Sequence, residues 1–192
     1  MTAFFAALGE AGLVQFGRFE QPDGAIWPVA VRLEWLPSYP ALLQQAAAAV
    51  QPLLAKTDVD RLLTTQAAIP LGVALSLRSG LPMVYPYGAA RDYTAAYVIE
   101  GAYDVGHPTV LLANMLVDAT QADAITAVAR KVGLDVGAVL AVLDLDLGAR
   151  QALETSGYAV HCVGTLRGAL DALGPPPLMR AAVEQWLEEG AK

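Results

Sequence analysis

Short apolar runs alternate along the chain with segments whose apolar residues recur every three to four positions. The apolar runs predict strands at residues 61–65, 82–85, 109–113, 136–143 and 158–163. The segments of helical period predict helices at residues 68–79, 121–132, 147–156 and 166–173. The run at 136–143 is almost continuously apolar, as in strands that are buried on both faces of a sheet. This alternation predicts an α/β fold with a parallel, doubly wound sheet and right-handed crossovers.

Glycine and proline mark where these elements end and where the alternation breaks down. Gly133, Gly157 and Gly174 stand where helix ends favour a left-handed residue. Residues 16–40 hold several glycines and prolines, which predicts short strands and turns. Residues 86–107 are rich in Gly, Ala and Tyr, and an insertion of this length is typical of a flexible binding loop.

Two further helices are predicted outside the alternation. Residues 36–55 carry no charge, but Pro40, Pro52 and three glutamines favour a buried helix with flanking turns over a membrane span. Three consecutive prolines at 175–177 precede an amphipathic helix at 178–189. We find no internal repeat and expect residues 1–192 to form a single domain.

Composition and charge exclude several classes of protein. Of the 192 residues, 55% are hydrophobic and 16% are charged, which excludes a disordered chain. The net charge of −7 argues against nucleic acid or an anionic membrane as the main partner. One cysteine, Cys162, excludes an internal disulfide framework, and two histidines nearly exclude a histidine metal cluster. We expect a cytoplasmic protein, with some apolar surface covered by a second copy.

Several segments, in register, resemble orotate phosphoribosyltransferases. They are WPVAVRLEWLPSYP at 27–40, AIPL at 68–71, SGLPMVY at 79–85, IEG at 99–101, VLL at 110–112, LD at 143–144 and GA at 148–149. The resemblance runs almost without gaps from about Gly12 to Leu173. It implies a type I phosphoribosyltransferase fold: a five-stranded, mostly parallel sheet flanked by helices, a hood formed by residues 1–40, a flexible loop at 86–107 and a homodimer.

The same resemblance implies a reaction and a ligand site. Such enzymes transfer ribose 5-phosphate from phosphoribosyl pyrophosphate (PRPP) to a nitrogenous base, with magnesium. Their signature places two adjacent acids after a strand, followed by a loop rich in Thr and Gly that opens onto a helix. The acids hold the ribose hydroxyls, and the loop amides bind the 5-phosphate.

This chain departs from that signature. Its matching segment, residues 110–122, reads VLLANMLVDATQA, so that Asn114 and Met115 stand in place of the acids and the loop holds no glycine. Asp118 adds a negative charge where the phosphate would lie. Thr120, with Asp123 three residues later, is predicted to cap the following helix locally.

Other positions of the family's anion site also differ. In the flexible loop, Tyr87, Gly88, Arg91 and Tyr93 stand where the family has mainly cationic residues. The arginine that follows the late aspartate is replaced by Leu145, next to the retained Asp144. A lysine that many members have before the Ile-Pro-Leu helix falls at Ala67.

These departures predict a relative that has lost PRPP-dependent catalysis and serves as a binding, regulatory or scaffold homodimer in nucleotide metabolism. No cofactor is expected, and the possible partners are a base or nucleotide and an enzyme of pyrimidine synthesis. By family position, the expected ligand-binding residues are Asn114, Met115, Asp118, Thr120, Tyr87 and Tyr93. The alternative is an active orotate-type phosphoribosyltransferase with unusual site residues, in which Arg91 and Asp144 are catalytic and magnesium is bound. A transcriptional regulator is a third class, which the acidic composition disfavours.

Some individual residues keep two interpretations. Arg91, Asp92 and Tyr93 form either a ligand clamp or a solvated loop. The tyrosines around residues 85–103 either stack on a base or pack the hood. Asp144 and Asp146 are either a metal pair or, as we favour, a strand end and helix start. We assign no catalytic role to His107 or His161 and expect Cys162 to be a small core residue. The tyrosines in question are those at positions 85, 87, 93, 97 and 103.

Overall fold

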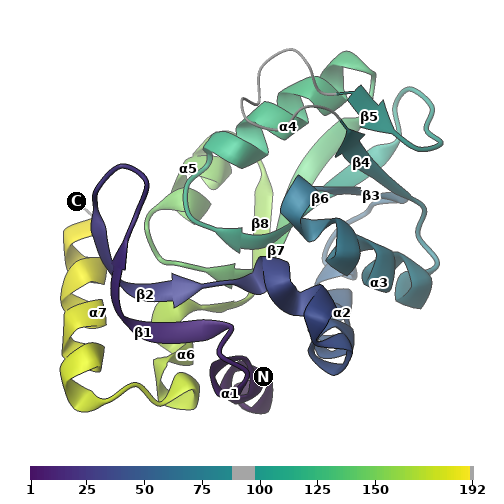
Figure 1. The fold of residues 1–192 in the computed structure, drawn as a ribbon. Coiled ribbons are helices and arrows are strands. Elements are labelled where there is room, and N and C mark those ends of the chain that lie inside the picture. Colours follow the sequence, from purple (N-terminus) through teal and green to yellow (C-terminus); the bar gives the residue numbers. More distant parts are fainter. Residues whose placement is uncertain (88–97, 191–192) are drawn as a thin grey trace.

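Within residues 1–87 and 98–190, which the computed structural model describes, a six-stranded sheet forms the centre of the molecule (Figure 1). Its strands are β3 (Arg61–Thr64), β4 (Met83–Tyr87), β5 (Val98–Glu100), β6 (Pro108–Leu116), β7 (Asp135–Asp144) and β8 (Ala159–Thr165). The order across the sheet is β5-β4-β3-β6-β7-β8. All neighbours are parallel except β5, which runs antiparallel to β4.

Helices cover both faces of this sheet and enclose two apolar cores. The first face carries α1 (Thr2–Glu10), α2 (Pro40–Leu54), α3 (Ile69–Ser79), α6 (Leu166–Leu173) and α7 (Pro177–Gly190). The second carries α4 (Thr120–Lys131) and α5 (Ala149–Thr155). Residues of β7 alternate between the cores, since Leu140 and Val142 belong to the first and Val139 and Ala141 to the second. This strand is therefore buried on both faces, as predicted.

The amino-terminal segment adds an antiparallel hairpin of β1 (Val14–Glu20) and β2 (Ile26–Val31). The pairing shifts register between Phe16 and Phe19, which is the mark of a β-bulge. The hairpin lies beside α7 (Figure 1), and the rings of Trp27 and Trp186 are 5.1 Å apart. A short 3-10 helix, η1 (Leu33–Ser38), then leads into α2, and a second, η2 (Gln66–Ala68), precedes α3.

The predicted α/β fold with a mostly parallel sheet is confirmed, and each predicted strand and helix is present with ends shifted by a few residues. Gly133, Gly157 and Gly174 have φ values of 89°, 91° and 61°, which confirms the predicted left-handed positions. None of the helices in the described residues is long and apolar enough to cross a membrane.

The predicted five-stranded sheet needs a correction, because a sixth strand lies at its edge. The five parallel strands are those predicted, and β5 adds a short antiparallel edge that pairs Tyr85 with Glu100. Three residues were too few for the sequence pattern to reveal a strand. Residues 88–97 of the predicted flexible loop lie outside the described residues, whereas the remainder of 86–107 includes the end of β4 and all of β5.

One glycine allows α3 to approach the sheet closely. A Cβ atom at Gly72 would lie 2.4 Å from Cγ2 of Thr64 and 2.7 Å from Sδ of Met83. Both distances are far below van der Waals contact, so a larger residue here would force the helix and the strands apart. Gly72 therefore sets the spacing between α3 and the strands beneath it.

Candidate functional site

A cavity of about 410 Å³ lies between the β1–β2 hairpin and the carboxyl ends of β6 and β7. Phe19, Trp27 and Val29 contribute from the hairpin, and Met115 and Leu145 close the cavity from the sheet. The carboxyl ends of parallel strands are the usual place for ligands in open α/β sheets. The cavity also lies within the volume range of small-molecule sites. We call it the hairpin cavity.

Asn114 points away from this cavity and is held by the backbone. It is 6% exposed, and its Nδ2 donates a hydrogen bond to the carbonyl oxygen of Ala67 at 2.9 Å. Its Oδ1 is buried without a hydrogen-bond partner. The side chain thus fastens β6 to η2, the turn before α3. The expected role of Asn114 in ligand binding stays a prediction, and its amide nitrogen is engaged by the backbone of Ala67.

Met115, the other residue in place of the acidic pair, is half-buried and packs against the first apolar core. It lines both the hairpin cavity and a neighbouring cavity of about 300 Å³. The second cavity is lined also by Thr65, Val117 and Asp118, and lies where α4 begins. A thioether is a soft, apolar group, so it separates the two cavities with an uncharged wall.

Asp118 occupies the amino-terminal end of α4 with its own carboxylate. Its Oδ1 accepts a hydrogen bond from the backbone N–H of Thr120 at 2.8 Å. The predicted cap through Thr120 and Asp123 is wrong, because the N-cap residue is Ala119 and no side chain caps the helix from that position. An Asp two residues upstream reaches the first free N–H more directly. Asp118 therefore supplies the negative charge that a helix N-terminus attracts.

Asp144, at the end of β7, is 3% exposed, and burial raises the pKa of its carboxyl group. Hydrogen bonding from Asp146 N–H and the charge of Arg150 act in the opposite direction. Nε of Arg150 lies 3.3 Å from Oδ2 of Asp144, within ion-pair distance but not aligned for a hydrogen bond. The backbone N–H of Asp146 donates to Oδ1 at 3.0 Å. The carboxylate is thus engaged inside the protein.

Asp146 does not form a metal site with Asp144. Its φ of 60° is left-handed, and its Oδ2 accepts a hydrogen bond from the N–H of Arg167, at the start of α6. The predicted strand end and helix start is therefore the better description. Across residues 1–87 and 98–190, no three His, Cys, Asp or Glu side chains are grouped so that they could hold a metal ion.

The predicted loop residues are only partly described. Tyr87 is 66% exposed at the end of β4 and touches neither cavity. Arg91 and Tyr93 lie outside the described residues, so the clamp interpretation stays a prediction. Cys162 is half-buried in β8, where desolvation raises the pKa of its thiol to about 11. Desolvation also lowers the pKa of His161, its neighbour.

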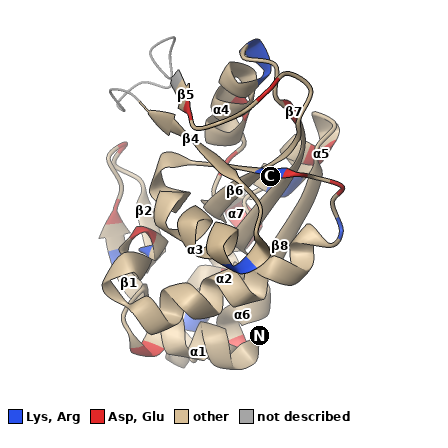
Figure 2. Ribbon diagram, turned by 90° about the vertical axis from the view of Figure 1, so that its right-hand side faces the viewer, with Lys and Arg blue, Asp and Glu red and all other residues tan. Residues whose placement is uncertain are grey.

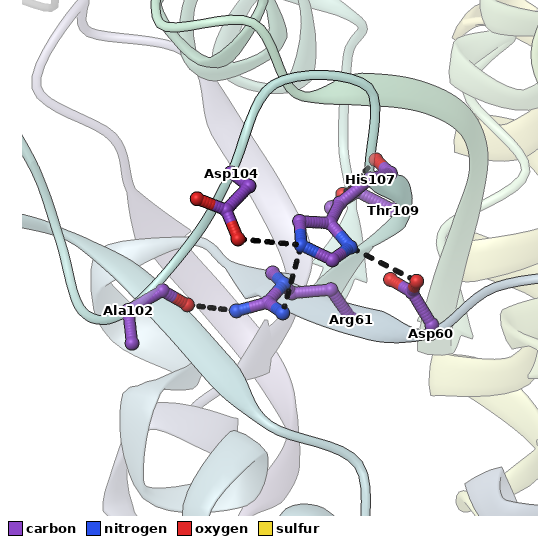
Figure 3. A network of polar contacts seen from close by, with 6 residues as sticks. All are labelled: Asp60, Arg61, Ala102, Asp104, His107 and Thr109. Carbon is purple, nitrogen blue, oxygen red and sulfur yellow. Dashed lines mark hydrogen bonds and ion pairs between the residues drawn. The ribbon is translucent and has the colours of Figure 1, made fainter.

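A polar network that sequence reasoning missed lies at the opposite end of the sheet, where β3 and β6 begin (Figure 3). Arg61, 7% exposed, donates from Nη1 to the carbonyl oxygen of Ala102, and its Nη2 lies 3.4 Å from Nε2 of His107. Nδ1 of His107 lies 2.9 Å from Oδ2 of Asp60, and Asp104 is 3.7 Å away on the other side. The network ties the turn after β5 to the amino ends of β3 and β6. In the sequence, the only sign of this network was a single arginine, Arg61, at the start of an apolar predicted strand.

The similarity of the chain to known proteins covers most of its length. An orotate phosphoribosyltransferase from Halobacterium salinarum is 31% identical over 170 residues, which are 87% of this chain and 95% of that protein. The bifunctional enzyme PyrF/PyrE from Nostoc is 25% identical over 154 residues, or 80% of this chain. This chain spans only 32% of that longer relative. No protein-family model matches the chain.

The fold is also similar to solved structures of related proteins. The structure of Leishmania donovani UMP synthase superposes with a TM-score of 0.88 at 26% identity. The match covers 98% of this chain and 42% of that protein. The similarity therefore includes the hairpin, the sheet and the carboxyl-terminal helix, and it extends across the cavities described above.

Proposed function

Because this chain belongs to the orotate phosphoribosyltransferase family, we propose that it keeps the family scaffold but no longer transfers ribose 5-phosphate from PRPP. It would act in the cytoplasm as a binding, regulatory or scaffold homodimer in pyrimidine nucleotide metabolism, with an enzyme of that pathway as a possible partner. The observation that carries this proposal is the carboxylate of Asp118 bound at the start of α4. A substrate phosphate would need the same place.

The electrostatic argument is simple. Two unit charges of the same sign about 4 Å apart repel by about 1 kcal/mol in bulk water and by about 4 kcal/mol at an effective dielectric constant of 20. The phosphate of PRPP would also compete with Asp118 for the N–H of Thr120, which already donates to it. Both effects disfavour an anion in the cavity at α4.

The residues present also suit magnesium poorly. Mg²⁺ prefers oxygen ligands in near-octahedral geometry. Oδ1 of Asn114 is buried, Met115 offers sulfur, and one oxygen of Asp118 is bound to the backbone. We therefore derive no step through a metal ion.

Apolar surface on α3 and η1 supports a homodimer. Val73 and Leu77 of α3 are 45% and 83% exposed and line a groove of about 570 Å³ between α2 and α3, and Trp35 of η1 is 47% exposed. In Figure 2, α2 and α3 are almost entirely tan, since α2 carries no charged residue and α3 only Arg78. A second copy would cover this face.

This surface can be tested by sedimentation. Leu77→Glu should shift the protein from dimer to monomer without changing its helix content, because Leu77 is 83% exposed and makes no core contact. Leu178→Glu, at a residue that is 76% exposed on α7, is the matched control and should leave the dimer intact. A wild-type protein that sediments as a monomer would refute the dimer.

The second candidate is an active orotate phosphoribosyltransferase. It is favoured by the comparisons, because the relatives bear that name and match along most of the chain. In this alternative, Arg91 and Asp144 would be catalytic and Asn114 and Asp118 would hold substrate with magnesium. The loss of catalysis that we propose stays a prediction until the two candidates are tested.

Calorimetry and a turnover assay separate the two candidates. We expect no binding of PRPP, with or without magnesium, and no formation of orotidine monophosphate from orotate. Asp118→Asn keeps the oxygen that accepts from Thr120 and removes the charge, so it should strengthen binding of inorganic phosphate about fivefold. Asn114→Asp combined with Met115→Asp should create no activity. Product formation by the wild-type protein would establish the second candidate.

A further inference from the structure

His107 links the start of β3 to the turn after β5, and its two ring nitrogens have different partners (Figure 3). Nδ1 lies 2.9 Å from Oδ2 of Asp60, and Nε2 lies 3.4 Å from Nη2 of Arg61. A carboxylate only accepts hydrogen bonds, and a guanidinium only donates them. Both contacts are therefore satisfied together by a neutral imidazole that carries its proton on Nδ1.

Arg61 depends on these contacts because its side chain is buried. It is 7% exposed, and its Nη1 donates to the carbonyl oxygen of Ala102 in the turn. Its Nε has no hydrogen-bond partner, and within residues 1–87 and 98–190 no carboxylate lies at ion-pair distance from the guanidinium. In this part of the chain, the carbonyl of Ala102 and Nε2 of His107 are its polar partners.

A proton on Nε2 of His107 would change these partners. Nε2 could no longer accept from Arg61, and two cations would then lie side by side. Oδ2 of Asp104 lies 3.7 Å from Nε2 and attracts the new N–H, but Asp104 belongs to the same turn, so this contact fastens nothing to β3. The contact with Asp60 becomes an ion pair, although Asp60 is 52% exposed and water screens the gain. Protonation therefore removes one link between β3 and the turn.

Two other elements bring charged residues toward His107. Asp135, at the start of β7, is exposed, and its backbone N–H donates to the carbonyl oxygen of His107 at 3.0 Å. The turn also meets the end of α4, since the N–H of Gly106 donates to the carbonyl oxygen of Gly133, and the last turn of this helix carries Arg130 and Lys131. Among the described residues, the charged groups within hydrogen-bond or ion-pair distance of the imidazole are Asp60, Arg61 and Asp104.

We propose that His107 is a pH-sensitive switch, which exchanges Arg61 for Asp104 at Nε2 and loosens residues 101–107 from β3 when the pH falls. Histidine is the side chain that ordinarily gains its proton between about pH 5 and pH 8. The turn continues from β5, a strand of three residues at the edge of the sheet, so the proton acts where the sheet has little pairing to hold it. The switch uses no residue of the two cavities near α4 and is independent of whether the protein uses PRPP.

NMR of the ring nitrogens in the full-length protein tests the exchange of partners. The chain has two histidines, so the spectrum of His161→Gln assigns the signals. Near about pH 8, the neutral ring of His107 should carry its proton on Nδ1, and Nε2 should take up the second proton as the pH falls. Asp104→Asn, at a side chain that is 96% exposed, should move the midpoint of this step to lower pH, because the charged ring loses an acceptor. A neutral ring that carries its proton on Nε2 overturns the proposal.

Amide hydrogen exchange tests the loosening of the turn. Relative to intrinsic rates, the amides of residues 101–104 should exchange roughly threefold to tenfold faster near pH 5.5 than near pH 8, as the loss of one hydrogen bond implies. His107→Gln gains no proton in this range, so its turn should exchange alike at both pH values, whereas His161→Gln should keep the wild-type response. The proposal is overturned if the wild-type turn exchanges equally at both pH values, or if His107→Gln shows the same change. The proton position is read on the wild-type protein, so the test remains decisive if His107→Gln fails to fold.

Discussion

The substitution Asn114→Asp restores the type of residue that the family resemblance implies at this position, and the structure indicates that it is costly. Nδ2 of Asn114 donates to the carbonyl oxygen of Ala67, and the side chain is 6% exposed. An ionised carboxylate cannot donate, so two oxygens that both carry negative charge would face each other in a buried place. Loss of one hydrogen-bond partner costs about 1–3 kcal/mol. A buried charge left without a partner raises this to about 3–5 kcal/mol.

The cost should depend on pH in a defined direction. Burial would raise the pKa of the new carboxyl group above its unfolded value, so the folded protein binds the proton more tightly. The difference in unfolding free energy between wild type and variant is then largest near neutral pH and shrinks as pH falls through the raised pKa. The protonated acid can also donate to Ala67, as the amide does.

Urea unfolding followed by tryptophan fluorescence measures this difference, near neutral pH and again near pH 5. Gln151→Glu is the matched control, since it makes the same amide-to-carboxylate change at an exposed residue of α5 and should stay within about 0.5 kcal/mol of wild type. The reasoning is refuted if Asn114→Asp is as stable as the control near neutral pH, or if its deficit grows as the solution is acidified.

Three further predictions concern packing and titration. Gly72→Ala should lower the free energy of unfolding by about 1–3 kcal/mol, because the new Cβ atom would overlap the sheet. Gly137→Ala, whose Cβ atom would meet nothing within 4 Å, should change this free energy little, and urea unfolding compares the two variants. Asp144→Asn should flatten the pH dependence of stability above the ordinary carboxyl pKa, because the raised pKa of Asp144 makes the wild type lose stability as pH rises through that range, and unfolding at several pH values checks it. Cys162, with a thiol pKa of about 11 against an ordinary 9.0, should react with iodoacetamide near pH 8 roughly a hundredfold more slowly than a free thiol, and denaturant should abolish the difference.

The elements of the fold could be predicted because their signals are local and repeated. The near-continuous apolar run of β7 indicates burial on both faces, and the structure divides its residues between two cores. Gly133, Gly157 and Gly174 end their helices in the left-handed region for the steric reason that makes glycine common there. Strand β5 was missed because three residues carry too little pattern, and its pairing with β4 is a tertiary contact.

The polar contacts could not be predicted because each depends on which backbone groups the fold brings near. Sequence spacing favoured Thr120 as the helix cap, but Asp118 reaches the free N–H of Thr120 instead. For Asp144 and Asp146 the sequence favoured a strand end and helix start over a metal pair, but it did not reveal that the left-handed backbone of Asp146 turns its carboxylate to the N–H of Arg167 in α6. The hydrogen bond from Arg61 could not be predicted, because the sequence does not show that the fold brings the carbonyl group of Ala102 next to it.

The scaffold and the ligand positions of this chain depend on different residues. The two cores are built by the inner side chains of β3, β6, β7 and the helices that cover them, and Val117 and Ala119 of the loop before α4 pack against their margins. At the family's ligand positions, Asn114 is bound to a carbonyl, Met115 joins a core, and Asp118 binds its own helix. Each of these residues has a contact inside the protein, although Oδ1 of Asn114 has no hydrogen-bond partner. Identity of 31% over 170 residues supports a shared fold, whereas chemistry depends on a small number of site residues. The scaffold of the family can therefore form with Asn114, Met115 and Asp118 at these positions, whatever they bind.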